Sequence, residues 1–280
     1  SAMGSMPMGS ADLNDIDFDA YLANDRTLSD PLVVRAAAGQ PIRLRVINGA
    51  ASTNFWLDLG QLSGQVVAVD GHDVSPVAGS RFPMAMAQRL DIVLRLPASG
   101  AYPVFAQVEG KTDRTGIILA TPGADIPKLS ATAAAMAPAV DLSLEAKLSA
   151  ATPLAARPAD LTLPMKLGGD MSPYKWSLNH RSWPNDDPAI IKTGQRILVD
   201  MTNNTMMSHP MHLHGHAFQV VAINNTTING AVRDTVLVPP MGRVLIAFDA
   251  NNAGRWALHC HNMYHMAAGM MTEIRYAGVV

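Results

Sequence analysis

The chain repeats a pattern of residues at a spacing of about 154 positions. Short motifs recur in the same order in both halves, so that Gln65–Val67 returns as Gln219–Val221 and Gly100–Tyr102 returns as Gly254–Trp256. Both copies alternate apolar and polar residues over short stretches, which is the period of a half-buried strand. A chain with this repeat is expected to fold as two similar β units.

Composition agrees with this interpretation. A length of 280 residues suits two ordinary domains, and 48% hydrophobic against 16% charged residues allows each a sizeable core. The 21 glycines and 19 prolines punctuate short apolar runs, as turns do between strands. The spacing of these runs is typical of Greek-key folds, so the predicted fold class is all-β, with two Greek-key β-sandwiches in tandem.

The repeat also predicts the domain boundaries. We expect a flexible segment over residues 1–20, a first domain over 21–122, a linker over 123–160 and a second domain over 161–280. The linker is rich in Ala, Pro, Ser and Leu, and one short helix is expected over Asp141–Ala150. The first five residues resemble the remnant of an expression tag. Methionines near the start are soft ligands that suit Cu(I), but a remnant followed by an interdomain strap is the simpler interpretation.

Several classes of function are disfavoured. A net charge of −2 gives no reason to expect nucleic acid or an acidic membrane as a partner. No apolar run reaches the roughly 18 residues of a membrane span, and no secretory signal is recognisable. Cys260 is the one cysteine in the sequence, so no internal disulfide is expected.

Seven of the nine histidines lie between positions 209 and 265. They form two blocks. The first contains His209, His212, His214 and His216, and the second contains His259, Cys260, His261 and His265, followed by Met270. Scattered surface or core histidines would not cluster in this way.

Strand parity divides these side chains between two sites. On a strand, Cys260 faces one side while His259 and His261 face the other. His212 and His214 share a face by the same rule, and His209 has the opposite parity. The loop that carries His265 and Met270 can fold back over Cys260. One strand is therefore predicted to serve two sites on opposite sides.

The two sets of ligands suit copper. One Cys, two His and a weak axial Met form a blue-copper electron-transfer site, which here means Cys260, His209, His265 and Met270. The other side offers only imidazoles, from His212, His214, His259 and His261, and such ligands suit copper that binds oxygen. The backbone from Cys260 to its two histidine neighbours gives electrons a short covalent route between the sites.

The two blocks resemble the C-terminal signatures of multicopper oxidases, the family of laccases, ferroxidases and bacterial copper-resistance oxidases. Residues 20–122 resemble the middle cupredoxin domain of that family and 160–280 the last one. The resemblance implies one-electron oxidation of a small reductant, such as a phenol or Cu(I), with O₂ reduced to water. It also implies a periplasmic or secreted location.

The resemblance assigns a role to each candidate ligand. It places His209, Cys260, His265 and Met270 at a type 1 copper, where Cys260, His209 and His265 would carry the electron-accepting chemistry. It places His212 at the type 2 copper and His214, His259 and His261 at the type 3 pair.

One part of the family pattern is missing. Its trinuclear cluster takes eight histidines, four of them from a first domain, and the only further histidines here are His72 and His180. The first repeat has Asn54–Asp58 and Phe105–Gln107 where the second has its copper blocks. We therefore expect that this chain lacks the family's N-terminal domain, is inactive alone and self-associates through the exposed face. A cupredoxin protein without enzymatic activity and a trimeric two-domain oxidase are the alternatives.

The remaining candidates have structural interpretations. His216 is expected to support a neighbouring ligand, and the nine methionines between 201 and 271 are expected mainly to fill the core. Trp256 is expected in the core, and His72 and His180 in solvated turns. For Asp234, which follows Arg233, a surface salt bridge is favoured over contact with a substrate near the type 1 site.

Overall fold

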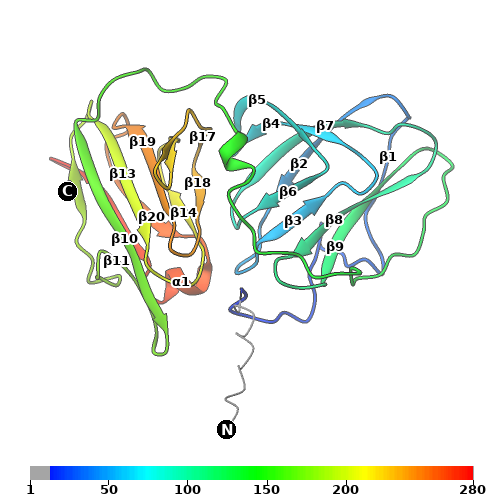
Figure 1. Ribbon diagram of the computed structural model, residues 1–280, viewed down its shortest axis with the longest axis horizontal. Helices are drawn as coiled ribbons and strands as arrows, with labels where there is room; N and C mark the ends of the chain where they lie inside the picture. Colours follow the sequence, from blue (N-terminus) through cyan, green and yellow to red (C-terminus); the bar gives the residue numbers. More distant parts are fainter. Residues whose placement is uncertain (1–12, 280) are drawn as a thin grey trace, which may run out of the picture.

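A computed structural model describes residues 13–279. Two β-sandwiches lie side by side, joined by a long connection that rises between them and passes over the top of the second (Figure 1). This arrangement confirms the all-β prediction of two tandem sandwiches. The predictions for the tag remnant and the N-terminal methionines lie outside the described residues.

The first sandwich contains a five-stranded sheet in the order β1-β9-β8-β3-β6 and a four-stranded sheet in the order β2-β7-β4-β5. Its strands are β1 (Val33–Arg35), β2 (Pro41–Ile47), β3 (Phe55–Asp58), β4 (Gly64–Val69), β5 (His72–Gly79), β6 (Arg81–Met84), β7 (Arg89–Arg95), β8 (Ala101–Val108) and β9 (Arg114–Ala120).

The second sandwich repeats this topology. Its five-stranded sheet runs β12-β21-β20-β14-β18, and its larger sheet runs β11-β10-β13-β19-β15-β16 with β17 also paired to β15. The strands are β10 (Leu161–Met171), β11 (Tyr174–Leu178), β12 (Ala189–Ile191), β13 (Arg196–Asn203), β14 (His209–Leu213), β15 (Phe218–Ile223), β16 (Thr226–Thr227), β17 (Val232–Arg233), β18 (Thr235–Val238), β19 (Arg243–Asp249), β20 (Arg255–Cys260) and β21 (Met271–Tyr276). The hairpin β10–β11 is an addition at one edge.

Strand register reproduces the sequence repeat. Leu57 of β3 lies opposite Ala106 of β8, and the residues 154 positions later, Met211 and Cys260, lie opposite each other on β14 and β20. Each sandwich encloses its own core, because inward-facing side chains alternate with outward ones along the strands. The two histidine blocks therefore occupy strand positions that have counterparts in the first sandwich.

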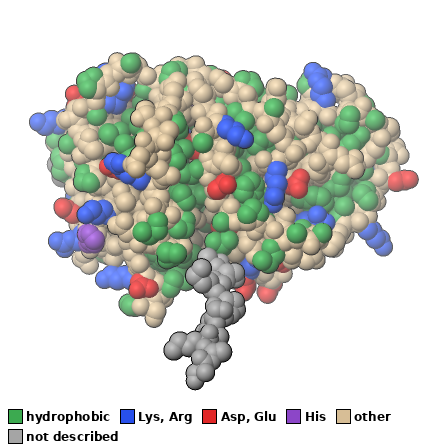
Figure 2. Space-filling view, viewed as in Figure 1, with side chains coloured by type: hydrophobic (Ala, Val, Ile, Leu, Met, Phe, Trp, Pro, Cys, Tyr) green, Lys and Arg blue, Asp and Glu red, His purple; other side chains and the backbone are tan. Residues whose placement is uncertain are grey.

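The linker between β9 and β10 contains no strand. Its only helix is a 3₁₀ turn, η1 (Glu145–Lys147), which is shorter than the helix expected over Asp141–Ala150. Charged side chains of both signs are interspersed on the face seen in Figure 2. Among residues 13–279, no helix is long and apolar enough to cross a membrane.

The segment before β1 is held against both domains. Asn14 donates a hydrogen bond to the backbone carbonyl of Glu109 in the first domain (3.0 Å), and Asp15 accepts one from Asn262 in the second (2.8 Å). Residues 13–20 therefore contact both domains as a strap, and the flexibility expected for residues 1–20 stays a prediction. The strap reaches the second domain because its polar side chains find partners there.

Candidate metal centre

Two neighbouring strands bring the histidine blocks together. On the antiparallel pair β14 and β20, Met211 lies opposite Cys260 and His212 lies opposite His259. Because side chains alternate along each strand, His209 falls on the Cys260 side and His212 on the His259 side. The structure thus forms two groups of donors on the two sides of one sheet.

The cysteine group consists of Cys260, His209, His265 and Met270, all fully buried. The Sγ of Cys260 lies 3.7 Å from the Nδ1 of His209 and 3.7 Å from the Nδ1 of His265, and the two nitrogens are 3.0 Å apart. Met270 accepts a backbone hydrogen bond from Cys260 and donates one to His265, at 3.1 and 3.0 Å. These bonds hold Met270 next to the three converging donors.

The imidazole group consists of His212, His214, His259 and His261. The Nε2 atoms of His214 and His259 are 3.0 Å apart, and His212 offers a third nitrogen within 4.8 Å of theirs. The ring of His261 lies 5.8 Å from that of His212 and 5.5 Å from that of His259, between ring centres. All four imidazoles predicted from strand parity are therefore neighbours.

The donors present fit copper. Burial raises the pKa of the Cys260 thiol far above its ordinary value, so a thiolate there requires a cation beside it. Burial also lowers the pKa of His209 well below its ordinary value, which leaves a neutral imidazole able to ligate a metal. A buried Cys with two imidazoles and a thioether is a donor set characteristic of blue copper.

Known proteins share this sequence and architecture. Family models described as multicopper oxidase match residues 8–122 and 156–278. The chain is 35% identical to the multicopper oxidase MmcO of Mycobacterium tuberculosis over 95% of this chain and 52% of that protein. It is 27% identical to copper resistance protein A of Escherichia coli over 96% of this chain and 62% of that protein. The laccase of Botrytis aclada has the same fold, with a TM-score of 0.75 at 21% identity over 88% of this chain and 53% of that one.

The chain belongs to the multicopper oxidase family. Members of this family are oxidoreductases that contain copper and use O₂. This multicopper oxidase chain spans between half and two thirds of the length of the two curated relatives described above. The family resemblance inferred from the histidine blocks is confirmed.

Neighbouring side chains hold both imidazoles of the cysteine group in place. The Nε2 of His209 lies 2.8 Å from the hydroxyl of Thr205. The Trp176 ring packs against both imidazoles, with centroid distances of 4.1 Å to His265 and 5.1 Å to His209. The short helix α1 (Met263–Ala267) carries His265 and starts at Asn262, whose side chain accepts a hydrogen bond from Tyr264. These protein contacts hold the two imidazole rings in place.

The strap covers the outer nitrogen of His265. The carboxylate of Asp15 lies 2.8 Å from the Nε2 of His265, and both side chains are almost fully buried. Burial opposes ionisation of Asp15, but its contacts with His265, Asn262 and Tyr174 outweigh burial and lower its pKa. A carboxylate in this position orients the imidazole so that Nδ1 faces Cys260.

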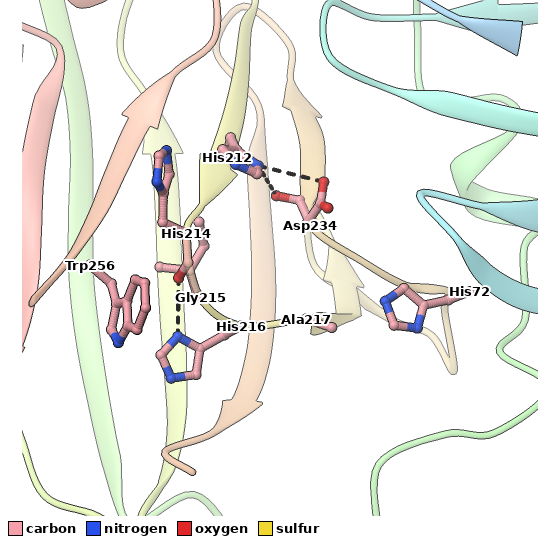
Figure 3. Close-up of a pocket in the computed structure, with 9 residues that line it drawn as sticks. His72, His212, His214, Gly215, His216, Ala217, Asp234 and Trp256 are labelled. Atoms are coloured by element: carbon pink, nitrogen blue, oxygen red, sulfur yellow. Dashed lines mark hydrogen bonds and ion pairs between the residues drawn. The ribbon is translucent and has the colours of Figure 1, made fainter. Parts of the chain in front are cut away.

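The imidazole group opens into a pocket of about 390 Å³ at the boundary of the two domains (Figure 3). His212, His214, Asp234 and Trp256 line it from the second domain, and His72 lines it from the first. Burial and the neighbouring imidazoles together lower the pKa of His259 to about 4. His259 is therefore neutral and available as a metal ligand.

Asp234 forms a salt bridge, as expected, and the partner is Arg89 of the first domain, at 2.8 and 2.6 Å. Its carboxylate is partly buried and lies beside His212 in the imidazole group (Figure 3). The adjacent Arg233 is buried and paired with Asp70 and Glu145.

The remaining candidate residues lie in different surroundings. His216 is buried and its Nε2 lies 2.6 Å from the Tyr276 hydroxyl, as expected of a structural histidine. His180 lies in an exposed turn, whereas His72 begins β5 and faces the pocket. Trp256 is partly buried against the second core. Of the nine methionines between 201 and 271, Met201, Met211 and Met270 are buried in the core, three are partly buried, and Met206, Met241 and Met263 are exposed, so core filling accounts for only part of them.

Three partners of the candidate ligands were not predicted from the sequence. Trp176, Thr205 and Asp15 contact the cysteine group, and none belongs to a histidine block. Thr205 stands four residues before His209, so local spacing offered a signal for it. Trp176 and Asp15 come from a different hairpin and from the strap, which no short-range pattern connects to Cys260.

Proposed function

We propose that this chain is the electron-accepting, C-terminal two-domain portion of a multicopper oxidase. In this proposal the cysteine group binds a type 1 copper and the imidazole group supplies half of the ligands of a trinuclear copper cluster. The observation that carries it is the position of Cys260 on β20, between two histidines that face the other side of the same sheet. The whole protein would oxidise a small reductant, phenol-like or Cu(I), and reduce O₂ to water.

The residues have distinct tasks in this proposal. Bound copper would supply one-electron redox chemistry at the cysteine group and oxygen chemistry at the complete cluster. His209 and His265 would hold the type 1 ion together with Cys260, and Met270 would be the weak axial ligand. His212 would bind the type 2 ion, and His214, His259 and His261 the type 3 pair.

The backbone supplies the electron route. Cys260 is joined by one peptide unit to His259 and by another to His261. The Nδ1 of His259 also lies 2.9 Å from the carbonyl oxygen of Cys260, which ties its ring to the same backbone. This link supports transfer from one side of the sheet to the other through bonds.

The remaining ligands would come from an N-terminal cupredoxin domain. The open pocket beside His212 and His214 is the face at which such a domain would complete the cluster. Without it, this face is a candidate for self-association. A trimer that completes its own cluster is disfavoured, because Phe55–Asp58 on β3 contains no histidine. By family resemblance, the location would be periplasmic or secreted.

Copper loading tests the proposal. The wild-type chain should develop an intense blue absorption band from the Cys260 thiolate, and Cys260→Ser should abolish it. The matched control is His180→Ser, which removes a histidine from an exposed turn and should leave the band unchanged. A folded, copper-loaded wild-type chain without the band would refute the assignment of the cysteine group.

A further inference from the structure

A network of buried and partly buried ion pairs joins the first domain to the second. Asp70, in the turn between β4 and β5, pairs with Arg233 at 3.0 Å, and their side chains are 0% and 2% exposed. Arg89, at the start of β7, pairs with Asp234 through both of its terminal nitrogens. The linker adds Glu145, which accepts a hydrogen bond from Arg233 at 2.5 Å. The two domains are thus locked together beside the imidazole group.

Asp70 also accepts hydrogen bonds from the backbone of the second domain. Its Oδ2 accepts hydrogen bonds from the amides of Asp234 and Thr235, at 3.2 and 3.1 Å. Its Oδ1 accepts one from the backbone amide of Arg89 at 2.9 Å, which fixes the carboxylate to its own domain. Asp70 therefore links the backbone of residues 234 and 235 to the first domain, where Arg89 also binds the Asp234 carboxylate and Gln88 donates to the Thr235 carbonyl at 3.2 Å.

The same two residues contact a candidate ligand. The Nδ1 of His212 lies 2.9 Å from the carbonyl oxygen of Asp234 and 3.0 Å from the hydroxyl of Thr235. A carbonyl oxygen only accepts, and the Thr235 hydroxyl donates its proton to the Asp234 carboxylate at 2.9 Å. Nδ1 must therefore carry a proton, which leaves Nε2 as the nitrogen that can bind a metal.

We propose that Asp70 and Arg89 are positioning residues for His212. Through the backbone amides and carboxylate of the segment that follows β17, they hold His212 in the Nδ1–H tautomer with Nε2 directed into the imidazole group. The inference rests on the proposed function, in which His212 is a copper ligand. It gives the copper-free domain a role at the cluster, although neither Asp70 nor Arg89 contacts the imidazole.

The tautomer of His212 is the decisive measurement. Nitrogen-15 NMR of the metal-free chain should show the Nδ1–H form in the wild type and a mixture of both forms in Asp70→Asn, because one amide oxygen cannot serve donors on both sides. Glu145→Gln is the matched control: it perturbs the same buried Arg233 but leaves the amides of Asp234 and Thr235 bound to Asp70. An unchanged tautomer in Asp70→Asn, or an equal change in Glu145→Gln, would overturn the inference.

A second pair of variants covers the case in which Asp70→Asn does not fold. Thr235→Val removes the hydroxyl beside Nδ1 and keeps the shape of the side chain, whereas Thr235→Ser keeps the hydroxyl. We expect Thr235→Val to increase the share of the Nε2–H form, because only the Asp234 carbonyl then accepts from Nδ1–H, whereas Thr235→Ser should retain the wild-type tautomer. Identical tautomers in both variants would count against the hydroxyl as part of the positioning path.

Copper affinity provides an independent readout. In a Cys260→Ser background, Cu²⁺ binding to the imidazole group should weaken by roughly 10- to 100-fold in Asp70→Asn, as expected for loss of a partner that orients a ligand. Glu145→Gln should bind as the parent does. With Cys260 present, the blue band should persist in both variants. If the copper-loaded wild type shows no blue band, the proposed function is overturned. If the band is present but Asp70→Asn binds Cu²⁺ as tightly as its parent does, only the role of Asp70 is overturned.

Discussion

A buried carboxylate at the domain boundary should make the stability of the chain fall as pH rises. Glu109, just after β8, is 3% exposed, and its oxygens accept hydrogen bonds from Asn54 and from the backbone amide of Val140, both at 2.8 Å. Within residues 13–279 no cation forms an ion pair with it. Burial therefore outweighs the two hydrogen bonds and raises the pKa of Glu109 from 4.5 to about 7.

The sign and size of the effect follow from proton linkage. Between pH 4.5 and 7 the folded chain keeps the Glu109 proton, while the unfolded chain loses it. The free energy of unfolding then decreases with pH across this window, by about 3 kcal/mol in total, and is constant above it. Below pH 4.5 both states are protonated and the penalty disappears.

The experiment compares the wild type with Glu109→Gln. Urea unfolding of both metal-free proteins, followed by tryptophan fluorescence from pH 4.5 to 8, yields the difference between their unfolding free energies. Histidine titrations are common to both proteins and cancel, and the amide that replaces the carboxylate shifts the difference by a constant. The wild type should lose about 3 kcal/mol relative to Glu109→Gln over this range.

Glu273 provides the control. Its partial burial acts to raise its pKa, but hydrogen bonds from Arg275 and Arg255 outweigh this and lower it. The stability contributed by Glu273 is therefore lost only as pH falls through its lowered pKa, so Glu273→Gln should differ from the wild type by a nearly constant amount above pH 5. If the Glu109 difference were equally flat, two hydrogen bonds would be sufficient to keep a buried carboxylate ionised, and the reasoning would be refuted.

Three further predictions concern the metal centre. Met270→Leu should raise the reduction potential of the cysteine group, because loss of the axial thioether favours the reduced ion; a lower potential in redox titration would contradict its role as a ligand. Gly215→Ala should lower the free energy of unfolding by roughly 2–5 kcal/mol, because the residue has a φ of +71° and a Cβ there would lie 2.4 Å from the Trp256 ring; unchanged urea unfolding would contradict this. The chain alone should not consume O₂ with a phenol or Cu(I) as donor, and activity should appear when the separately produced N-terminal domain is added; steady turnover that tracks the copper content of the chain alone would contradict the half-cluster proposal.

Periodicity was sufficient to predict the architecture and the grouping of the ligands. The 154-residue repeat predicted two matching sandwiches, and the paired registers of β3–β8 and β14–β20 agree with it. Parity on β14 and β20 separated His209 from His212 and Cys260 from its histidine neighbours. These predictions succeed because alternation of side chains is a local property of a strand, independent of what packs against it.

Contacts between distant segments could not be predicted in the same way. Asp15 lies 250 positions from His265, and Asp70 lies more than 160 positions from Asp234. The turn Asp70-Gly71 looked solvated, because turn sequences carry polar residues for local reasons. The structure buries Asp70 because five donors from both domains surround its carboxylate, which only the packing of the domains can arrange.

The first domain keeps the geometry of the metal-binding fold but uses it differently. Leu57 and Ala106 occupy the register positions of Met211 and Cys260, so an alanine stands where the second domain has its cysteine. The loops of the first domain have instead acquired buried acids: Asp70 binds the second domain and Glu109 binds the linker. A buried carboxylate is costly unless donors surround it, so its presence at a boundary favours the one arrangement of domains that supplies those donors. In this way a domain without copper can determine the orientation of an imidazole in its neighbour.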